Sequence, residues 1–209
     1  MARVVVLLAA LAVGVTGCSG QPEAVVTPSA PATSRVQPST PSPTSPVAGT
    51  RAPAPAAGAG LARSAPVRLQ VAAIGLDSPL MSLGLQADGT MQVPKGGFPA
   101  GWYTGGPTPG ELGPGVIAGH VDMNGPGVFY RLHELRPGDR VVVTRQDGSK
   151  PVFRVTRLAL FPKDQFPTRL VYGNTNRSVL RLITCGGSFN SRTGHYEDNI
   201  IAFADLVGP

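Results

Sequence analysis

The chain has 209 residues, of which 42% are hydrophobic and 6% aromatic, and its formal net charge is +6. This length suits one domain with appendages, and 27 glycines and 22 prolines exclude a mostly helical fold. The positive charge favours an anionic envelope or membrane surface. No dense run of lysine and arginine is present, which argues against a nucleic-acid partner.

The first 17 residues are typical of an export signal. Arg3 supplies the positive start, and an apolar stretch over residues 4–15 follows that is too short to span a bilayer comfortably. The stretch ends in Val15-Thr-Gly-Cys18, which resembles the bacterial lipobox that directs lipid attachment to cysteine. We therefore expect a lipoprotein-type signal peptide over residues 1–17 and lipidation of Cys18. The alternative is an ordinary signal peptide or a short anchor with an incidental cysteine.

Residues 18–65 are rich in proline, alanine, serine and threonine. Such a segment buries too little apolar surface to offset its ordering entropy, so we expect a disordered, semi-extended tether. It could hold a domain away from the membrane or through a wall, or it could be a linker of no particular length.

The composition changes near Pro66, and residues 66–209 predict one β-rich domain. Alternating or β-branched runs predict strands over residues 67–73, 80–83, 91–94, 140–145, 151–160 and 199–205. Asp147-Gly148 is a hairpin signal between two of them. One helical turn is expected over residues 128–135, and residues 161–172 form a long loop. Seven or eight short strands with turn-rich connections indicate a closed or nearly closed all-β barrel.

Two further apolar strands each end at a reactive side chain beside glycine. One runs from Ser178 to Cys185 and is followed by two glycines that should stop it; the other ends in Gly119 and His120. If Cys18 carries lipid, Cys185 is a lone thiol in an exported protein, where a thiol is a liability unless it is buried or functional. The pattern favours a cysteine nucleophile with a histidine partner. A buried structural cysteine and a packed histidine remain the alternative.

Four segments together resemble the sortases, the cysteine transpeptidases of Gram-positive cell envelopes. They are Val116-Ile-Ala-Gly-His120, the run from Val128 to Asp139, Leu182-Ile-Thr-Cys185, and Thr193-Gly-His-Tyr196 before a final apolar strand. The chain looks most similar to class F sortases, in which Thr-Cys-Gly-Gly and Thr-Gly-His-Tyr occur together.

The resemblance implies a closed eight-stranded β-barrel with one or two short helical turns. It implies cleavage of a Leu-Pro-x-Thr-Gly-like sorting signal between Thr and Gly through a thioacyl intermediate, followed by transfer to an amine, with no cofactor and no metal. Cys185 would be the nucleophile, His120 the general acid and base, and Thr184 and Phe166 substrate-binding residues. The implied partners are sorting-signal peptides of secreted proteins and the amine of a wall precursor or pilin. The expected protein is a monomer anchored by its N-terminal lipid at the extracellular face of the membrane, or secreted or otherwise tethered if Cys18 is not lipidated.

The third catalytic group departs from the family pattern. Most sortases carry an arginine on the last strand, a few residues after an aromatic, but here Tyr196 is followed by glutamate, aspartate and asparagine. We expect Arg192, in the preceding loop, to take this role within reach of Cys185. Arg181 is the competitor, because it shares a strand face with Cys185, although four residues of strand span about 13 Å.

The remaining candidates have simpler interpretations. His195 is structural or lines the pocket, His133 lies on the surface, and Asp122 could orient His120 but is more consistent with a solvated turn. A zinc site from Cys185, His120 and His195 lacks any supporting spacing. Two other functions remain open: a hydrolytic cysteine peptidase of the same fold, and a catalytically silent envelope-binding lipoprotein.

Overall fold

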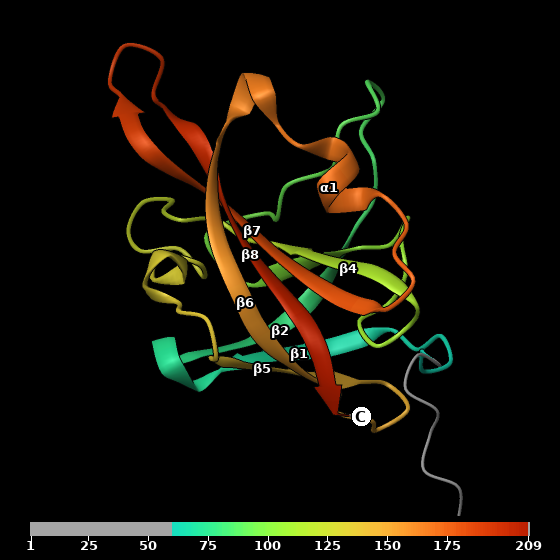
Figure 1. Ribbon diagram of the computed structural model, residues 1–209. Coiled ribbons are helices and arrows are strands. Elements are labelled where there is room, and N and C mark those ends of the chain that lie inside the picture. The colour runs from blue at the N-terminus through green and yellow to red at the C-terminus, as the bar shows by residue number, and fades with distance from the viewer. Residues whose placement is uncertain (1–59, 209) are drawn as a thin grey trace, which may run out of the picture. The chain divides into compact units, whose positions relative to one another are not determined.

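The computed structural model describes residues 60–208, which form an eight-stranded closed barrel (Figure 1). The predicted signal peptide, Cys18 and most of the predicted tether lie outside these residues. The strands follow the order β1-β2-β3-β4-β7-β8-β6-β5, and β1 pairs with β5 to close the barrel. This confirms the predicted fold class. The strands are β1 Pro66–Val71, β2 Leu76–Leu83, β3 Ala100–Tyr103, β4 Gly113–Ala118, β5 Arg140–Arg145, β6 Val152–Pro162, β7 Ser178–Asn190 and β8 His195–Gly208.

The barrel interior holds the main core, to which all eight strands contribute side chains. In β5, for example, Val141 and Val143 are buried while Arg140 is exposed, as expected for a strand with one face inward. Burial of this interior is the principal stabilising contribution to the fold. Its other members include Leu69, Val71, Trp102, Ile117, Phe153, Val155, Leu180, Leu182, Ala202 and Ala204.

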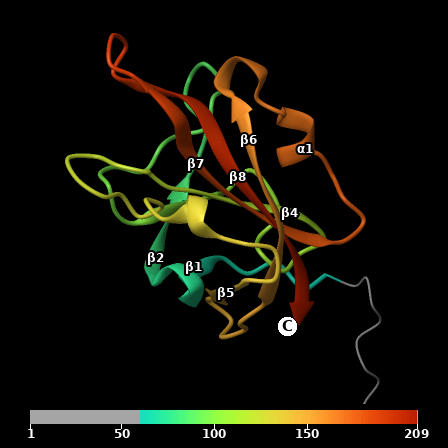
Figure 2. The same cartoon turned by 60° about the vertical axis from the view of Figure 1, so that its left-hand side comes forward.

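A second apolar cluster lies on the outer face of the barrel wall. Val116 of β4, Ile183 of β7, and Ile201 and Phe203 of β8 pack there against Val171 of the short helix α1 (Thr168–Tyr172). Figures 1 and 2 show α1 beside the outer side of these strands. Because β4 is covered on both faces, all six of its residues are buried, which explains why its sequence is continuously apolar rather than alternating.

Several local predictions need correction. Residues 161–172, expected to be a loop, contain the 3₁₀ turn η3 (Lys163–Gln165) and α1. The predicted turn over 128–135 is reduced to η2 (Leu132–Glu134), and a further turn, η1, spans Ala72–Ile74. Residues 91–94 were predicted to form a strand but form none of the eight strands. Strand β3, over Ala100–Tyr103, was not predicted from the sequence. Strand β3 is four residues long and includes Gly101 packed against Leu83, so it carries little periodic signal. No helix in residues 60–208 is both long and apolar enough to cross a bilayer.

Strand β7 does not stop at its two glycines, contrary to the sequence prediction. It continues to Asn190 and forms with β8 a long hairpin that extends beyond the barrel (Figure 1). The pairing shifts register between Gly186 and Phe189, so the glycines create a bulge rather than a strand end. Gly187 has φ of +73°, a conformation that glycine adopts without strain.

Residues 61–64 form an N-terminal strap on the barrel. The Leu61 amide donates to the Gly110 carbonyl over 2.7 Å, and the Arg63 guanidinium lies 3.3 Å from both the Gly106 carbonyl and the Glu111 carboxylate. The buried Arg145 guanidinium donates to the carbonyls of Ala62 and Ser64. Among the described residues, contacts with the barrel therefore already include residues 61–64, ahead of the predicted boundary at residue 66.

Candidate active site

Strands β4 and β7 bring His120 and Cys185 together. The two strands pair in parallel from Gly113 opposite Ser178 to Ala118 opposite Ile183, and the Gly119 amide then donates to the Ile183 carbonyl over 3.0 Å. Continuing this register by two residues places His120 beside Cys185. Directly paired residues of neighbouring strands project from the same face. Cys185 follows Ile183 at a spacing of two, so it projects from the outer face, where it is half-buried.

The backbone around His120 is tightly packed. The His120 carbonyl accepts a hydrogen bond from the Phe129 amide over 2.9 Å, and a Cβ atom on Gly127 would collide with this carbonyl. The His120 Nε2 atom lies 2.9 Å from the carbonyl oxygen of Pro94. A carbonyl can only accept, so Nε2 carries hydrogen and Nδ1 is left for proton exchange.

Residues that pair across β4, β7, β8 and β6 project from the same side, so the side chains of the outer face form rows that run across these four strands. The row of Cys185 contains Asn199 on β8, Phe161 on β6 and, by continuation of the β4 register, His120 just after β4. The next row is entirely apolar. The third row holds Val116, Arg181, Phe203 and Arg157.

Arg181 is not brought to Cys185. Its guanidinium carbon lies 4.6 Å from the centre of the Phe203 ring, and Nη1 donates to the Leu180 carbonyl over 3.0 Å. The side chain therefore leans toward β8, two rows from the thiol. Burial lowers the pKa of Arg181 to about 10, and the nearby Asp205 carboxylate only partly opposes this shift.

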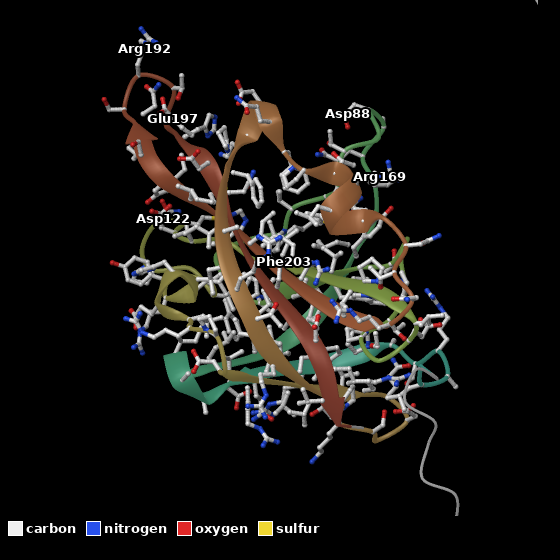
Figure 3. All side chains as sticks on the ribbon, in the orientation of Figure 1. Asp88, Asp122, Arg169, Arg192, Glu197 and Phe203 are labelled. Carbon is white, nitrogen blue, oxygen red and sulfur yellow. The ribbon has the colours of Figure 1, made fainter. Side chains whose placement is uncertain are left out.

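Arg192 is also not brought to Cys185, contrary to the expectation from the sequence. It is exposed at the tip of the β7–β8 hairpin, where its amide donates to the Asn190 side-chain oxygen over 3.1 Å. Figure 3 shows its side chain pointing away from the barrel. Asn190, the last residue of β7, lies five positions beyond Cys185, a distance of about 16 Å along a strand. This exceeds the reach of an arginine side chain.

Thr184 does not fit its predicted role as a substrate contact. It lies between Ile183 and Cys185, so its side chain projects to the opposite face, into the barrel, and it is 3% exposed. A substrate on the outer face would not contact it.

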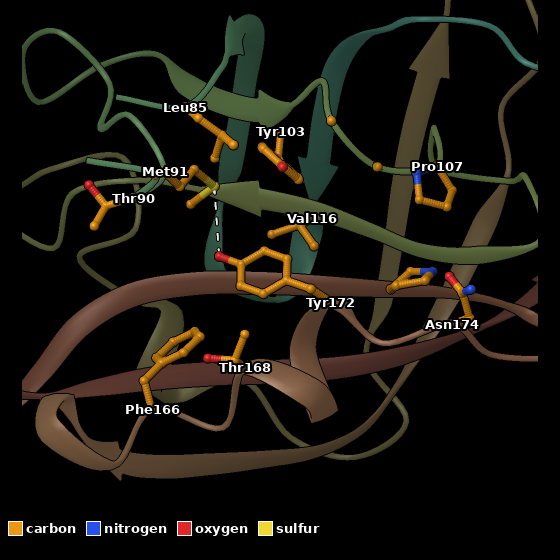
Figure 4. A pocket seen from close by; sticks show the side chains of 14 residues that line it. Leu85, Thr90, Met91, Tyr103, Pro107, Val116, Phe166, Thr168, Tyr172 and Asn174 are labelled. Carbon is orange, nitrogen blue, oxygen red and sulfur yellow. Dashed lines mark hydrogen bonds between the residues drawn. The ribbon is translucent and has the colours of Figure 1, made fainter. Parts of the chain in front are cut away.

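Phe166 does line a groove of about 600 Å³ on the outer face (Figure 4). The floor is formed by Tyr103 of β3 and by Pro114 and Val116 of β4. One wall comes from the segment between β2 and β3, and the other from Phe166 and α1. The Tyr172 hydroxyl lies 3.9 Å from the Met91 sulfur across the groove. Val116 of the groove floor and Ile183, two residues before Cys185, belong to the same outer cluster, so the groove lies on the face from which Cys185 projects.

The minor candidates have other partners or are exposed. Asp122 accepts a hydrogen bond from the Tyr196 hydroxyl over 2.5 Å, so it pairs with the β7–β8 hairpin rather than with His120. His195 is exposed on that hairpin, and exposed His133 has its Nδ1 atom 3.0 Å from the Tyr130 carbonyl. Within residues 60–208, no group of three or more His, Cys, Asp or Glu side chains could hold a metal ion.

Comparison with known families identifies the fold. The model of the sortase domain matches residues 69–207. The chain belongs to the sortase family and is a cysteine transpeptidase of that family. A comparison with curated proteins finds no match.

Solved sortase structures share the barrel at low sequence identity. A lid mutant of sortase A from Corynebacterium diphtheriae is 18% identical with a TM-score of 0.53, over 68% of this chain and 69% of that one. Streptococcus pneumoniae sortase C is 17% identical with a TM-score of 0.53, over 69% and 67%. A Clostridium perfringens sortase D5 transpeptidase is 20% identical with a TM-score of 0.51, over 69% and 79%. These likenesses concern the fold.

The resemblance implied that residues 161–172 shape a substrate groove, with a solvent loop as the alternative, and the structure places Phe166 and Tyr172 in the groove lining. Sequence reasoning did not assign Met91 or Val116 to a groove, and it did not single out Asn199 beside Cys185. The signal for Asn199 was present, because it lies in the segment after Tyr196 where an arginine was sought. Only the strand register distinguishes it from Glu197 and Asp198.

Proposed function

We propose that this sortase cleaves a Leu-Pro-x-Thr-Gly-like sorting signal between Thr and Gly and transfers the threonyl group to an amine of a wall precursor or pilin. The observation that supports this most is the parallel β4–β7 pair, whose register places His120, just after β4, beside Cys185 within β7 on the same face as the groove. An extended peptide in the groove would present its scissile carbonyl to the thiol.

The residue types support acyl transfer in two steps. The Cys185 thiolate adds to the threonyl carbonyl, and the tetrahedral intermediate collapses to a thioester as protonated His120 gives its proton to the departing glycine amine. The acceptor amine then attacks the thioester while His120 takes its proton. The sulfur leaves as the thiolate, so the enzyme returns to its starting state.

The sequence features also support a class F sortase held at the outer membrane surface by lipid on Cys18. The Thr-Cys-Gly-Gly and Thr-Gly-His-Tyr segments support the class, and the lipobox-like segment supports the anchor.

The activity is tested by incubating the chain without its signal peptide with a library of Leu-Pro-x-Thr-Gly-like peptides, with and without triglycine, and reading the products by mass spectrometry. We expect cleavage between Thr and Gly and a triglycine adduct. Cys185→Ala should abolish both products while circular dichroism stays unchanged, because the thiol lies on the outer face.

Other outcomes would change the proposal. Cleavage that yields only the free threonine acid would indicate a hydrolytic peptidase. No reaction, together with no alkylation of Cys185 under native conditions, would indicate a silent envelope-binding protein. Near-normal turnover by Cys185→Ala would reject the thioacyl mechanism.

The anchor is tested separately in a bacterial host fed a labelled fatty acid. Wild-type chain should incorporate label and Cys18→Ala should not, because the thioether needs that sulfur. Equal labelling of both would show that Cys18 is not the attachment site.

A further inference from the structure

Asn199 is the residue directly opposite Cys185 in the antiparallel pair of β7 and β8. Side chains at such positions have their Cβ atoms about 5 Å apart and project from the same face. The residue two positions along, Ile201, belongs to the outer apolar cluster with Ile183, so Asn199 and Cys185 both project outward.

The Asn199 amide is available to a substrate. The residue is half-buried, and no hydrogen bond among residues 60–208 involves its side chain. Its neighbour on the other side is Phe161 of β6, and the next row of the outer face is apolar. A primary amide offers two N–H donors, and low-dielectric surroundings strengthen the hydrogen bonds that they make.

No arginine in the described part of the chain competes for this position. The row of Cys185 contains His120, Asn199 and Phe161. Arg181 leans over Phe203 two rows away, and Arg192 is exposed at the hairpin tip. A neutral donor thus occupies the place beside the thiol where a positive charge was expected.

We propose that Asn199 is a catalytic residue that donates a hydrogen bond from its Nδ2 atom to the oxyanion of the tetrahedral intermediate; this rests on the proposed transpeptidation. When the Cys185 sulfur bonds to the threonyl carbon, the carbonyl π pair moves to the oxygen, which accepts the Asn199 N–H. The pair returns as the C–N bond breaks, and the glycine amine leaves with the proton from His120.

A neutral donor has a distinctive consequence. It stabilises the charge that develops on the carbonyl oxygen, but it adds no positive charge to favour the thiolate. Turnover of peptide should therefore depend on Asn199, whereas alkylation of Cys185 by iodoacetamide, which forms no oxyanion, should not.

The test compares Asn199→Ala, Asn199→Asp and a matched control, Asn176→Ala, which changes an exposed asparagine in the bend before β7. We expect Asn199→Ala to lower kcat/KM by about 10²- to 10³-fold, the usual effect of losing one oxyanion donor. Its rate of alkylation by iodoacetamide should stay within about twofold of wild type. The control should match wild type in both measurements.

Asn199→Asp keeps the size of the side chain and replaces a donor with a negative charge. It should lower turnover at least as much as Asn199→Ala. It should also slow alkylation at neutral pH, because a neighbouring negative charge raises the pKa of a thiol.

The outcomes separate this assignment from the proposed function. If the wild-type chain cleaves no peptide, both are overturned. If wild type is active and Asn199→Ala retains turnover within about threefold, the assignment alone fails. A parallel loss of turnover and alkylation in Asn199→Ala would show that Asn199 only positions the cysteine, which also overturns the oxyanion role.

Discussion

Arg181 is a charged side chain held in an apolar part of the outer face. It is 7% exposed, and its Nε atom has no hydrogen-bond partner among residues 60–208. Its pKa is lowered to about 10, chiefly by burial. The fold therefore binds this proton less tightly than the unfolded chain does. The resulting cost to stability is present below pH 10 and is relieved only as the pH rises toward the ordinary arginine value.

We expect Arg181→Met to be as stable as wild type, or more stable by up to about 2 kcal/mol, because a flexible apolar side chain can cover Phe203 without a desolvated charge. The measurement is urea denaturation at pH 7. The control is Arg177→Met, which removes an exposed partner of Asp205 and should change stability by less than about 1 kcal/mol. A loss above about 2 kcal/mol in Arg181→Met alone would show that the guanidinium–Phe203 contact outweighs the cost of burial.

At the scale of elements, the β7–β8 hairpin is tied to the segment that follows His120. The Tyr196 hydroxyl donates to the Asp122 carboxylate, and the Tyr196 ring meets Phe189 edge-on with ring centres 5.2 Å apart. The hydrogen bond to Asp122 is the main cause that raises the pKa of Tyr196. The hydrogen bond from Tyr196 to Asp122 is therefore fully formed at pH values below the ordinary tyrosine pKa. It is lost as the pH rises through the raised pKa of Tyr196, because the tyrosinate has no proton to donate.

We predict that the tyrosinate absorbance difference between wild type and Tyr196→Phe will titrate above pH 10. The same difference measured in an Asp122→Asn background should titrate at lower pH, because the amide keeps an acceptor but removes the charge. Identical midpoints in the two backgrounds would show that the hairpin and the His120 segment are not tied in solution.

At the scale of the whole molecule, the N-terminal strap supplies two carbonyl acceptors for the buried Arg145 guanidinium. Arg145 lies on β5, the strand that closes the barrel by pairing with β1. A chain that begins at Ala65 lacks the carbonyls of Ala62 and Ser64, which leaves a fully buried guanidinium with fewer partners.

We expect the chain 65–209 to be less stable than the chain 60–209 by about 2–4 kcal/mol, as for other buried charges that lose their partners. The measurement is the urea midpoint of each chain. Arg145→Met should recover most of the loss in the shorter chain and little in the longer one. Equal stability of the two unaltered chains would show that the strap contributes nothing and that the domain begins at residue 66.

The sequence alone was sufficient for the local features. Period-two burial in β5 and in the first half of β6, and the Asp147-Gly148 turn with its positive φ at Gly148, depend on neighbouring residues. The same is true of the two apolar strands that lead toward His120 and through Cys185. Such patterns can be predicted from the sequence because backbone conformation and side-chain alternation are local properties.

Tertiary structure decided which side chains meet. His120 and Cys185 are 65 positions apart and become neighbours only because β4 and β7 pair in parallel. Thr184 faces inward because side chains alternate along β7 and Ile183 lies in the outer cluster, and Arg192 lies far from the thiol because the hairpin is long. Asn199 stands beside Cys185 through the register of β8. Strand register and length are set by barrel closure and by hydrogen bonds between distant segments. The sequence could therefore nominate Cys185 and His120 as candidates, whereas the fold decided that Asn199 lies beside Cys185.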